Sequence, residues 1–253
     1  MNAPALPQDP LLPAPICARL LAHARAHSPQ EACGLLLRCK NSWYFRPHPN
    51  QARHPEQHFE IAAEAVLAGM EAEEMVIFHS HPAGPPWPSL ADMRQQQETG
   101  HPWLIAALGK EDQLFWLGRQ ESYDLLDRPY RHGTTDCYGL IRDWYQRVAG
   151  ISLPDFPRSW DWWQQGGDLY RHHFAAAGFY RLAEEADKQP GDVFLARIRS
   201  PVVNHGGLLL ENGQLLHHPA GSQGFDALAR PRREPLGRWQ KFAEIWLRHR
   251  EME

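Results

Sequence analysis

The spacing of apolar residues in the first half of the chain changes between helical and strand patterns, which predicts a mixed α and β domain. Apolar residues three to four apart indicate amphipathic helices, whereas short apolar or alternating runs indicate strands. We expect helices over residues 16–27, 62–70 and 90–98, and strands over 34–38, 43–46, 75–81, 103–108 and 113–117. Residues 1–14 are rich in proline and predict a loose arm ahead of this domain.

A further helix is predicted to begin at Cys137 and to end at Gly150, a residue typical of helix C-termini. It carries one apolar stripe, formed by Leu140, Ile141, Trp144 and Val148. Cys137 would lie in the first turn, where the helix dipole favours a thiolate and lowers the pKa of a thiol. Because a free cysteine is more often a small buried hydrophobe, a catalytic role for Cys137 requires a histidine partner.

Two histidines flank a predicted hairpin whose tip contains Asn-Gly, and the loop length decides whether they can cooperate. A two-residue loop, 212–213, would turn His217 away from His205. A three-residue loop, 211–213 with its glycine left-handed, places His217 opposite Gly207 and on the same face as His205, about 7–8 Å away at the backbone. We predict the three-residue loop.

The length of 253 residues suits two small domains. We place the boundary so that the domains comprise residues 1–125 and 126–253, with the linker in the segment 122–133. The fold class is therefore α+β with two domains. The pattern of residues 239–249 fits either a strand or a helix.

Composition excludes several classes of partner. Lys+Arg 26 against Asp+Glu 30 gives a net charge of −4, and without a basic run no nucleic-acid partner is expected. No apolar stretch approaches the ~18–20 residues that span a membrane, and the N-terminus lacks the pattern of a signal peptide. The four cysteines form no Cys-x-x-Cys pair and are expected to be reduced. The cluster Trp160, Trp162 and Trp163 suits either a packed core or the wall of a substrate cleft.

The most informative motif follows the apolar run 75–78. His79 and His81 are two apart on a strand, so their side chains leave the same face. Together with Asp92 they provide three zinc ligands and leave one position open, which is typical of catalytic zinc. Ser89 and Asp92 also fit a helix N-cap with an acidic residue in the first turn, and the two interpretations are compatible.

The string His-Ser-His-Pro, six residues, Ser, two residues and Asp resembles the motif of the JAMM (MPN-plus) metallopeptidases. This resemblance implies a JAMM-like α/β/α domain in which His79, His81 and Asp92 bind Zn²⁺. In such domains an upstream glutamate is the general base, in a Glu-x-Cys-Gly context that Glu31 matches here. Ser89 would hydrogen-bond the developing oxyanion.

The second half resembles the NlpC-type cell-wall cysteine peptidases, a papain-like family, in its Asp-Cys-x-Gly segment and its His-x-Gly…Asn-Gly…His hairpin. The resemblance implies that Cys137 is the nucleophile, that His205 is the general base and that His217 orients this base. Tyr138 departs from the family, in which many members have serine. His218 competes for the orienting role but is expected to point to the other face of its strand. The family implies cleavage between D-γ-glutamate and diaminopimelate.

The order of the two domains resembles the tail tip proteins of lambda-like phages, over nearly the whole chain. This resemblance implies a peptidase that acts on cell-wall peptide or isopeptide bonds, with other tail tip proteins and the peptide of peptidoglycan as its partners. It would be made in the host cytoplasm, reside in the virion tail tip and act in the host periplasm. The alternative is a structural assembly component whose catalytic sites are inactive or occluded. An isopeptidase for ubiquitin-like proteins would leave the Cys137 half unexplained.

Overall fold

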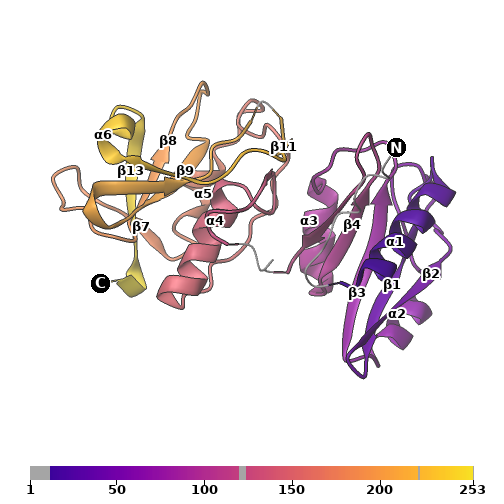
Figure 1. The fold of residues 1–253 in the computed structure, drawn as a ribbon. Coiled ribbons are helices and arrows are strands. Elements are labelled where there is room, and N and C mark those ends of the chain that lie inside the picture. Colours follow the sequence, from indigo (N-terminus) through magenta and orange to yellow (C-terminus); the bar gives the residue numbers. More distant parts are fainter. Residues whose placement is uncertain (1–11, 120–123, 222, 253) are drawn as a thin grey trace. The chain divides into compact units, whose positions relative to one another are not determined.

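The computed structural model describes residues 12–119, 124–221 and 223–252, and the chain divides near residue 122 into two compact units (Figure 1). Most of the predicted arm, residues 1–11, lies outside the described residues. Its last part was assigned wrongly, because Leu12 is buried and helix α1 (Ala14–His27) already begins at Ala14. Apolar packing of Leu12 against the core therefore extends the first unit toward the N-terminus.

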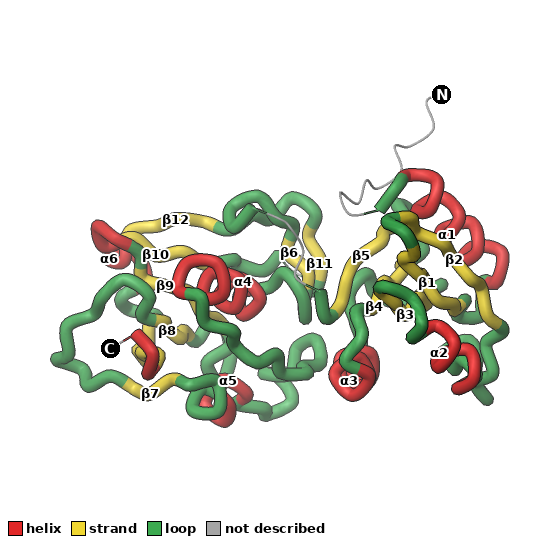
Figure 2. Tube along the Cα trace, turned by 90° about the horizontal axis from the view of Figure 1, so that it is seen from below, coloured by secondary structure: helices red, strands yellow, loops and turns green. Residues whose placement is uncertain are grey.

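The first unit is a five-stranded sheet between helices, in the strand order β2-β1-β3-β4-β5. Only β3 and β4 are parallel, and the other neighbours are antiparallel. Figure 2 shows α1 on one face of the sheet and α2 and α3 on the other, which is the predicted α/β/α arrangement. The elements besides α1 are β1 (Cys33–Cys39), β2 (Ser42–His48), α2 (Ala63–Gly69), β3 (Glu74–His81), α3 (Leu90–Thr99), β4 (Trp103–Ala107) and β5 (Gln113–Leu117).

Alternation along β3 decides which side chains meet which helix layer. Val76 and Phe78 pack into the core under α1, whereas Met75 and Ile77 pack into the core on the side of α3. His79 and His81 continue the second series, because strand side chains repeat every two residues. The sheet thus delivers both imidazoles to the face that α3 covers.

The second unit is built on a six-stranded sheet in the order β12-β10-β9-β8-β13-β7, with a small two-stranded sheet of β6 and β11. Helix α4 packs its apolar side chains against this sheet, and its residues Leu140, Ile141 and Trp144 are buried in the shared core. The elements are β6 (Tyr130–Arg131), α4 (Cys137–Trp144), α5 (Leu169–His173), β7 (Phe179–Arg181), β8 (Val193–Ala196), β9 (His205–Leu209), β10 (Gln214–His217), β11 (Phe225–Asp226), β12 (Arg232–Pro235), α6 (Leu236–Trp239) and β13 (Ala243–His249).

The structure settles one segment that the sequence pattern left open and corrects the bounds of another. Residues 239–249 form the end of α6 followed by strand β13, which lies between β8 and β7 in the sheet. The predicted linker 122–133 is too long, because β6 at Tyr130–Arg131 pairs with β11 inside the second unit. Linker residues 122 and 123 lie outside the described residues.

The predicted helix stripe is right as far as Trp144 and wrong at Val148, which is 59% exposed. The cause is a π-helical turn, Tyr145–Ala149, that continues α4. The wider turn rotates Val148 toward solvent and buries Tyr145, whose hydroxyl donates to the Gly191 carbonyl at 2.7 Å. Gly150 ends the helix in the left-handed region at φ 72°, as predicted.

The hairpin prediction is confirmed. His217 pairs with Gly207, and the Leu210 amide donates to the Gln214 carbonyl at 2.7 Å, which leaves the three-residue loop 211–213. The glycine of this loop has φ 67°, and the preceding Asn212 is also left-handed, at φ 60°. A loop of odd length shifts the register by one residue, so both histidines face the same side of the sheet.

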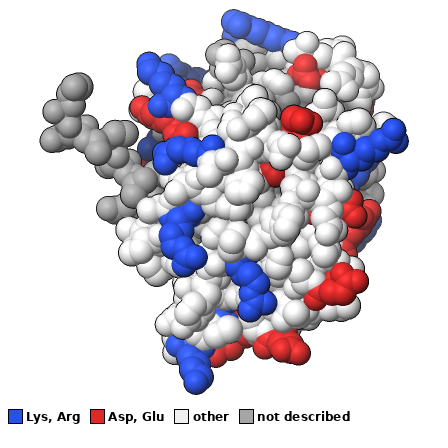
Figure 3. All heavy atoms as spheres, turned by 90° about the vertical axis from the view of Figure 1, so that its right-hand side faces the viewer, with Lys and Arg blue, Asp and Glu red and all other residues white. Residues whose placement is uncertain are grey.

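No helix among the described residues has the length and apolar character that crossing a bilayer requires. On the face drawn in Figure 3, basic and acidic side chains are interspersed rather than gathered by sign.

Candidate active sites

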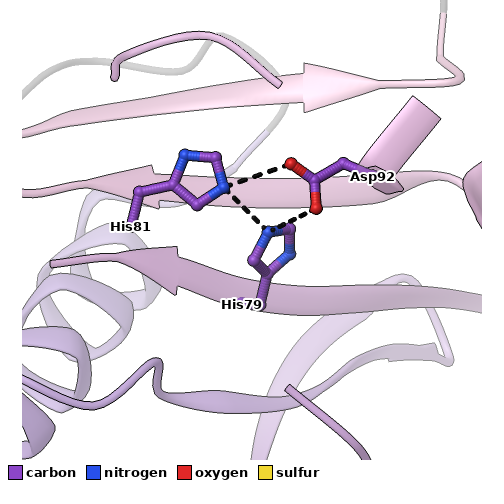
Figure 4. Close-up of side chains that lie close together, drawn as sticks. All are labelled: His79, His81 and Asp92. Atoms are coloured by element: carbon purple, nitrogen blue, oxygen red, sulfur yellow. Dashed lines mark hydrogen bonds and ion pairs between the residues drawn. The ribbon is translucent and has the colours of Figure 1, made fainter. Parts of the chain in front are cut away.

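The first candidate site is a cluster of two histidines and one carboxylate from two different elements. His79 and His81 extend from the end of β3, and Asp92 extends from the first turn of α3 (Figure 4). The two Nε2 atoms lie 3.1 Å apart, Asp92 Oδ1 lies 3.3 Å from His79 Nε2, and Asp92 Oδ2 lies 3.2 Å from His81 Nε2. Among the described residues, these three form a group with the composition and spacing to hold a metal ion.

The spacing suits a tetrahedral zinc ion. Zinc-to-ligand bonds of 2.0–2.1 Å imply a separation of about 3.3 Å between neighbouring ligand atoms. His81 Nδ1 lies 3.0 Å from the Pro85 carbonyl, which can only accept a proton, so the lone pair of His81 is on Nε2 and faces the cluster. His79 Nδ1 is buried without a hydrogen-bond partner in the described part of the chain. The donor set and its geometry therefore fit zinc.

The same geometry sets the direction in which the pKa of each group in the cluster is shifted. Burial alone would lower the pKa of His81, but the hydrogen bond and charge of Asp92 outweigh it and raise this pKa. Complete burial lowers the pKa of His79. The two histidines hold the pKa of Asp92 well below its usual range despite its burial. The negative charge of Asp92 thus favours a positive charge in the cluster, as a metal ligand should.

Ser89 and Asp92 form a capping box at the start of α3. Ser89 Oγ accepts from the Asp92 amide at 3.0 Å, and Asp92 Oδ2 accepts from the Ser89 amide at 2.7 Å. The segment therefore fits both interpretations: these side chains cap the helix, and Asp92 also faces the two imidazoles as a metal ligand would. The Ser89 hydroxyl accepts through a lone pair, so its own proton remains available for donation.

Glu31 and Ser89 line the same cleft as His81 and Asp92. Burial raises the pKa of Glu31 to about 7, against the opposing charge of His81. The sequence did not point to Asn50, which fixes this part of the cleft. Its amide nitrogen donates to the carbonyls of Glu31 and His58, both at 2.9 Å, and so ties the Glu31 backbone to the segment 56–59, which lines the same cleft.

Aromatic side chains enclose His79. The Phe59 ring stacks on the imidazole at a centroid distance of 4.4 Å and an interplanar angle of 15°, and Trp103 contacts it edge-on at 5.4 Å. Such packing holds the imidazole in one orientation and excludes water from one side of the cluster. Phe59 lies in a segment for which the sequence predicted no element, so this contact was not foreseen.

The second candidate site centres on Cys137, which lies at the start of α4 as predicted. Asp136 caps this helix by accepting from the Gly139 amide at 2.9 Å. Cys137 Sγ lies 3.2 Å from the Tyr170 hydroxyl. The expected lowering of the thiol pKa is wrong for this structure, because burial and the charge of Asp136 raise it. The hydrogen bonds from Tyr170 and the Gly206 amide oppose the increase without cancelling it.

His205 and His217 come together on the hairpin, with His205 Nε2 and His217 Nδ1 3.0 Å apart. Burial lowers the pKa of His205 to about 3 and that of His217 to about 4, so both imidazoles are neutral near pH 7. His218 lies elsewhere and donates from Nδ1 to the Thr135 carbonyl at 2.7 Å. No hydrogen bond joins Cys137 to His205 within the described residues; the thiol instead meets the backbone of Gly206, the next residue.

A buried ion pair supports the start of α4, and nothing in the sequence indicated it. Arg158 donates to both carboxylate oxygens of Asp136, at 2.9 and 3.0 Å, and also to Asp155. Burial alone would raise the pKa of Asp136, but Arg158, His132 and the backbone amides lower it to about 2. The Asp136 carboxylate that caps α4 beside Cys137 is therefore negatively charged, and the Arg158 guanidinium compensates this charge.

Two members of the tryptophan cluster pack together and also line a cavity. Trp162 is buried and packs edge-on against Trp163, at a centroid distance of 5.7 Å. Both rings line a cavity that reaches Cys137 and Tyr170. The indoles are thus part of the hydrophobic packing and also form the wall of the space beside the thiol.

Comparison with known proteins identifies the families of both domains. Residues 13–118 match the family of prokaryotic homologs of the JAB domain, and residues 127–234 match the NlpC/P60 family. Tail tip assembly protein K of Escherichia phage lambda is 38% identical over 183 residues, which cover 72% of this chain and 85% of the relative. Tail tip assembly protein K of Escherichia phage N15 is 31% identical over 205 residues, which cover 80% and 83%. With a JAB-like first domain, an NlpC/P60 second domain and these relatives, the chain belongs to the tail tip assembly protein K family.

Proposed function

We propose that this protein is a two-domain peptidase of the phage tail tip, zinc-dependent in its first domain and cysteine-dependent in its second. The observation that carries the proposal is the convergence of His79, His81 and Asp92 at 3.1–3.3 Å, which suits a zinc ion and which helix capping by Asp92 does not explain for the two histidines. The paired His205 and His217 beside Cys137 support the same conclusion for the second domain. We place the domains at residues 1–125 and 126–253.

In the first domain, His79, His81 and Asp92 would hold the ion. Zinc supplies Lewis acidity there and lowers the pKa of a water to about 7. Glu31, on the wall of the same cleft, would accept a proton at its carboxylate and pass it to the leaving amine. The Ser89 hydroxyl would donate its free proton to the carbonyl oxygen that becomes negative.

In the second domain, His205 would take the thiol proton as Cys137 Sγ bonds to the amide carbon. The carbon–nitrogen bond breaks, and the proton passes to the departing amine. Water then cleaves the thioester, which releases the acid and restores the thiol. His217 would hold His205 in place through the 3.0 Å contact between their rings. Family resemblance favours the D-γ-glutamyl-diaminopimelate bond of peptidoglycan as the substrate of this domain.

Digestion of purified muropeptides, followed by mass spectrometry of the products, tests this proposal. We expect Cys137→Ala to lose one cut and His79→Ala to lose a second activity, either a cross-link cleavage or the processing of another tail protein. Matched controls are Cys39→Ala, which removes an exposed free cysteine, and His54→Ala, which removes an exposed histidine of the first unit. If both single variants behave as the wild type does, the enzymatic proposal is wrong.

One observation favours a second function, that of an assembly component with an occluded second site. Cys137 is 8% exposed, its thiol contacts Tyr170 rather than a histidine, and burial raises its pKa. In that case the purified chain leaves muropeptides uncut, and Cys137→Ala still supports the assembly of infectious tails. Either way we propose that the protein works with other tail proteins. It would be made in the host cytoplasm, reside in the tail tip and act in the periplasm.

A further inference from the structure

We infer that Glu234 is a positioning residue that sets the tautomers of His205 and His217, and that Trp239 holds the Glu234 carboxylate for this purpose. The inference rests on the proposed cysteine-peptidase function of the second domain. It adds two residues, both beyond the nucleophile, base and orienting histidine already described.

The strand pairing brings Glu234 to His217. On the β10–β12 pair, His217 lies opposite Arg232, so Glu234, two residues further on, is its diagonal neighbour on the same face. Glu234 Oε2 lies 3.7 Å from His217 Nε2. This nitrogen is buried and has no hydrogen-bond partner among residues 12–119, 124–221 and 223–252. The carboxylate is therefore the acceptor nearest to a buried ring nitrogen that needs one.

Trp239 fixes both ends of this contact. Its indole N–H donates to Glu234 Oε2 at 2.6 Å, which aims the carboxylate. Its ring packs against His217 at a centroid distance of 4.4 Å and against His205 at 5.3 Å. One side chain from α6 thus contacts the carboxylate and both imidazoles and restricts the orientation of all three.

The charge of Glu234 then decides where the ring protons lie. A carboxylate facing His217 Nε2 favours a proton on that atom, which leaves the lone pair on Nδ1. His217 Nδ1 must then accept from His205 Nε2, 3.0 Å away. The lone pair of His205 is consequently on Nδ1, the ring nitrogen that does not contact His217 and that is left free to accept a proton. The opposite tautomers would set a lone pair of His217 against the carboxylate and leave no base.

The other charged groups near this pair do not provide such an acceptor. Arg232, opposite His217, and Arg238, near Glu234, are cations, and Arg232 acts on His217 in the direction that removes its proton. His218 also acts on His205 as a like charge. Glu234 is the anion that acts on His217 in this environment. When it is removed, no negative charge near His217 Nε2 favours a proton on that atom.

Nitrogen-15 NMR of the full chain labelled at histidine tests the inference, because imidazole shifts report the tautomer directly. We expect His205 and His217 of the wild type to carry their protons on Nε2. Glu234→Ala should mix the tautomers, and Glu234→Gln, which keeps an acceptor oxygen but no charge, should do so less. The control is Glu211→Gln, an exposed acid in the loop of the same hairpin, which should leave both rings unchanged.

Hydrolysis of the muropeptide provides a second readout. Glu234→Ala should lower kcat about 10- to 100-fold with KM unchanged. This is less than the roughly 10²- to 10⁴-fold that a general base itself contributes, because the base is retained and only its tautomer is mixed. Trp239→Phe, which keeps a ring but loses the N–H, should lie between Glu234→Ala and the wild type. Wild-type tautomers in Glu234→Ala would overturn the inference. An inactive wild type with ordered tautomers would instead contradict the proposed function, and the two failures are therefore distinct.

Discussion

Cys137 Sγ and the Tyr170 hydroxyl lie 3.2 Å apart, a contact that joins the first turn of α4 to α5, 33 residues further along the chain. The hydroxyl favours the thiolate, although burial keeps the pKa of Cys137 above its usual value. The thiol of Cys137 is thus held neutral, in a domain whose paired histidines His205 and His217 are also neutral near pH 7.

Removing this hydroxyl should make the thiol less reactive. In Tyr170→Phe the thiolate loses a hydrogen bond, so we expect the pH midpoint of iodoacetamide alkylation of Cys137 to move upward. The matched control is Tyr138→Phe, whose hydroxyl donates to the Pro154 carbonyl and not to the sulfur. A midpoint that moves equally in both variants would contradict a specific role for Tyr170.

The first domain should bind about one zinc ion per chain, as expected for a three-ligand site. His81→Ala should abolish this binding, because it removes the ring whose lone pair the Pro85 carbonyl directs at the cluster. His54→Ala, which alters an exposed histidine of the same unit, should retain it. Metal analysis of the purified proteins is the measurement, and zinc retained by His81→Ala would refute the assignment.

Arg158 should be far more important for stability than a surface arginine. Arg158→Met leaves the buried Asp136 charge unpaired, which costs about 3–5 kcal/mol of unfolding free energy. Arg230→Met breaks an exposed pair with Asp127 and should cost less than about 1 kcal/mol. Hydrogen exchange in urea, resolved to peptides of the second unit, measures both. Equal losses would show that burial of the pair is irrelevant.

The same pair makes part of the stability dependent on acid pH. The pKa of Asp136 is about 2 in the folded state against an ordinary value of 3.8. Its contribution is therefore complete above about pH 4 and is lost as the pH falls through about 2. The stability gap between the wild type and Asp136→Asn should narrow over this range, as measured by unfolding at each pH. A gap that is independent of pH would be inconsistent with a charged Asp136.

Gly207 should tolerate no side chain. An added Cβ would lie 2.6 Å from His217 Cβ, the Leu216 carbonyl oxygen and a ring carbon of Phe194. Gly207→Ala should therefore separate the histidine pair and reduce both muropeptide cleavage and thermal stability. Gly237→Ala, whose added Cβ meets nothing within 4 Å, should leave both unchanged.

The sequence predicted what depends on short-range pattern. Alternation along β3 placed His79 and His81 on one face, and turn chemistry fixed the register that pairs His217 with Gly207. Helix capping signals located Ser89 and Asp92 at the start of α3. Each of these relationships is set within about a dozen residues, where spacing and local hydrogen bonding decide the structure.

What the sequence did not predict depends on contacts between distant segments. The partners Tyr170, Arg158 and Asn50 reach their sites from loops or short helices that carry no periodic signal. The pKa of the Cys137 thiol was expected to be lowered at a helix N-terminus. This prediction was wrong because the burial of the thiol, which depends on distant segments, and the charge of the adjacent Asp136 outweigh the favourable hydrogen bonds. The assignment of Val148 to the apolar stripe was wrong because a π-helical turn, which has no clear sequence signature, interrupts the 3.6-residue period.

Asp92 closes the N-terminus of α3 and also faces the two imidazoles. A relative without the proposed metal chemistry would still lose part of the capping box by replacing this residue, whereas His79 and His81 cap no helix. When relatives of this protein are examined for the proposed metal chemistry, the pair of histidines is therefore the more informative marker. A retained aspartate by itself shows only that the helix cap is intact.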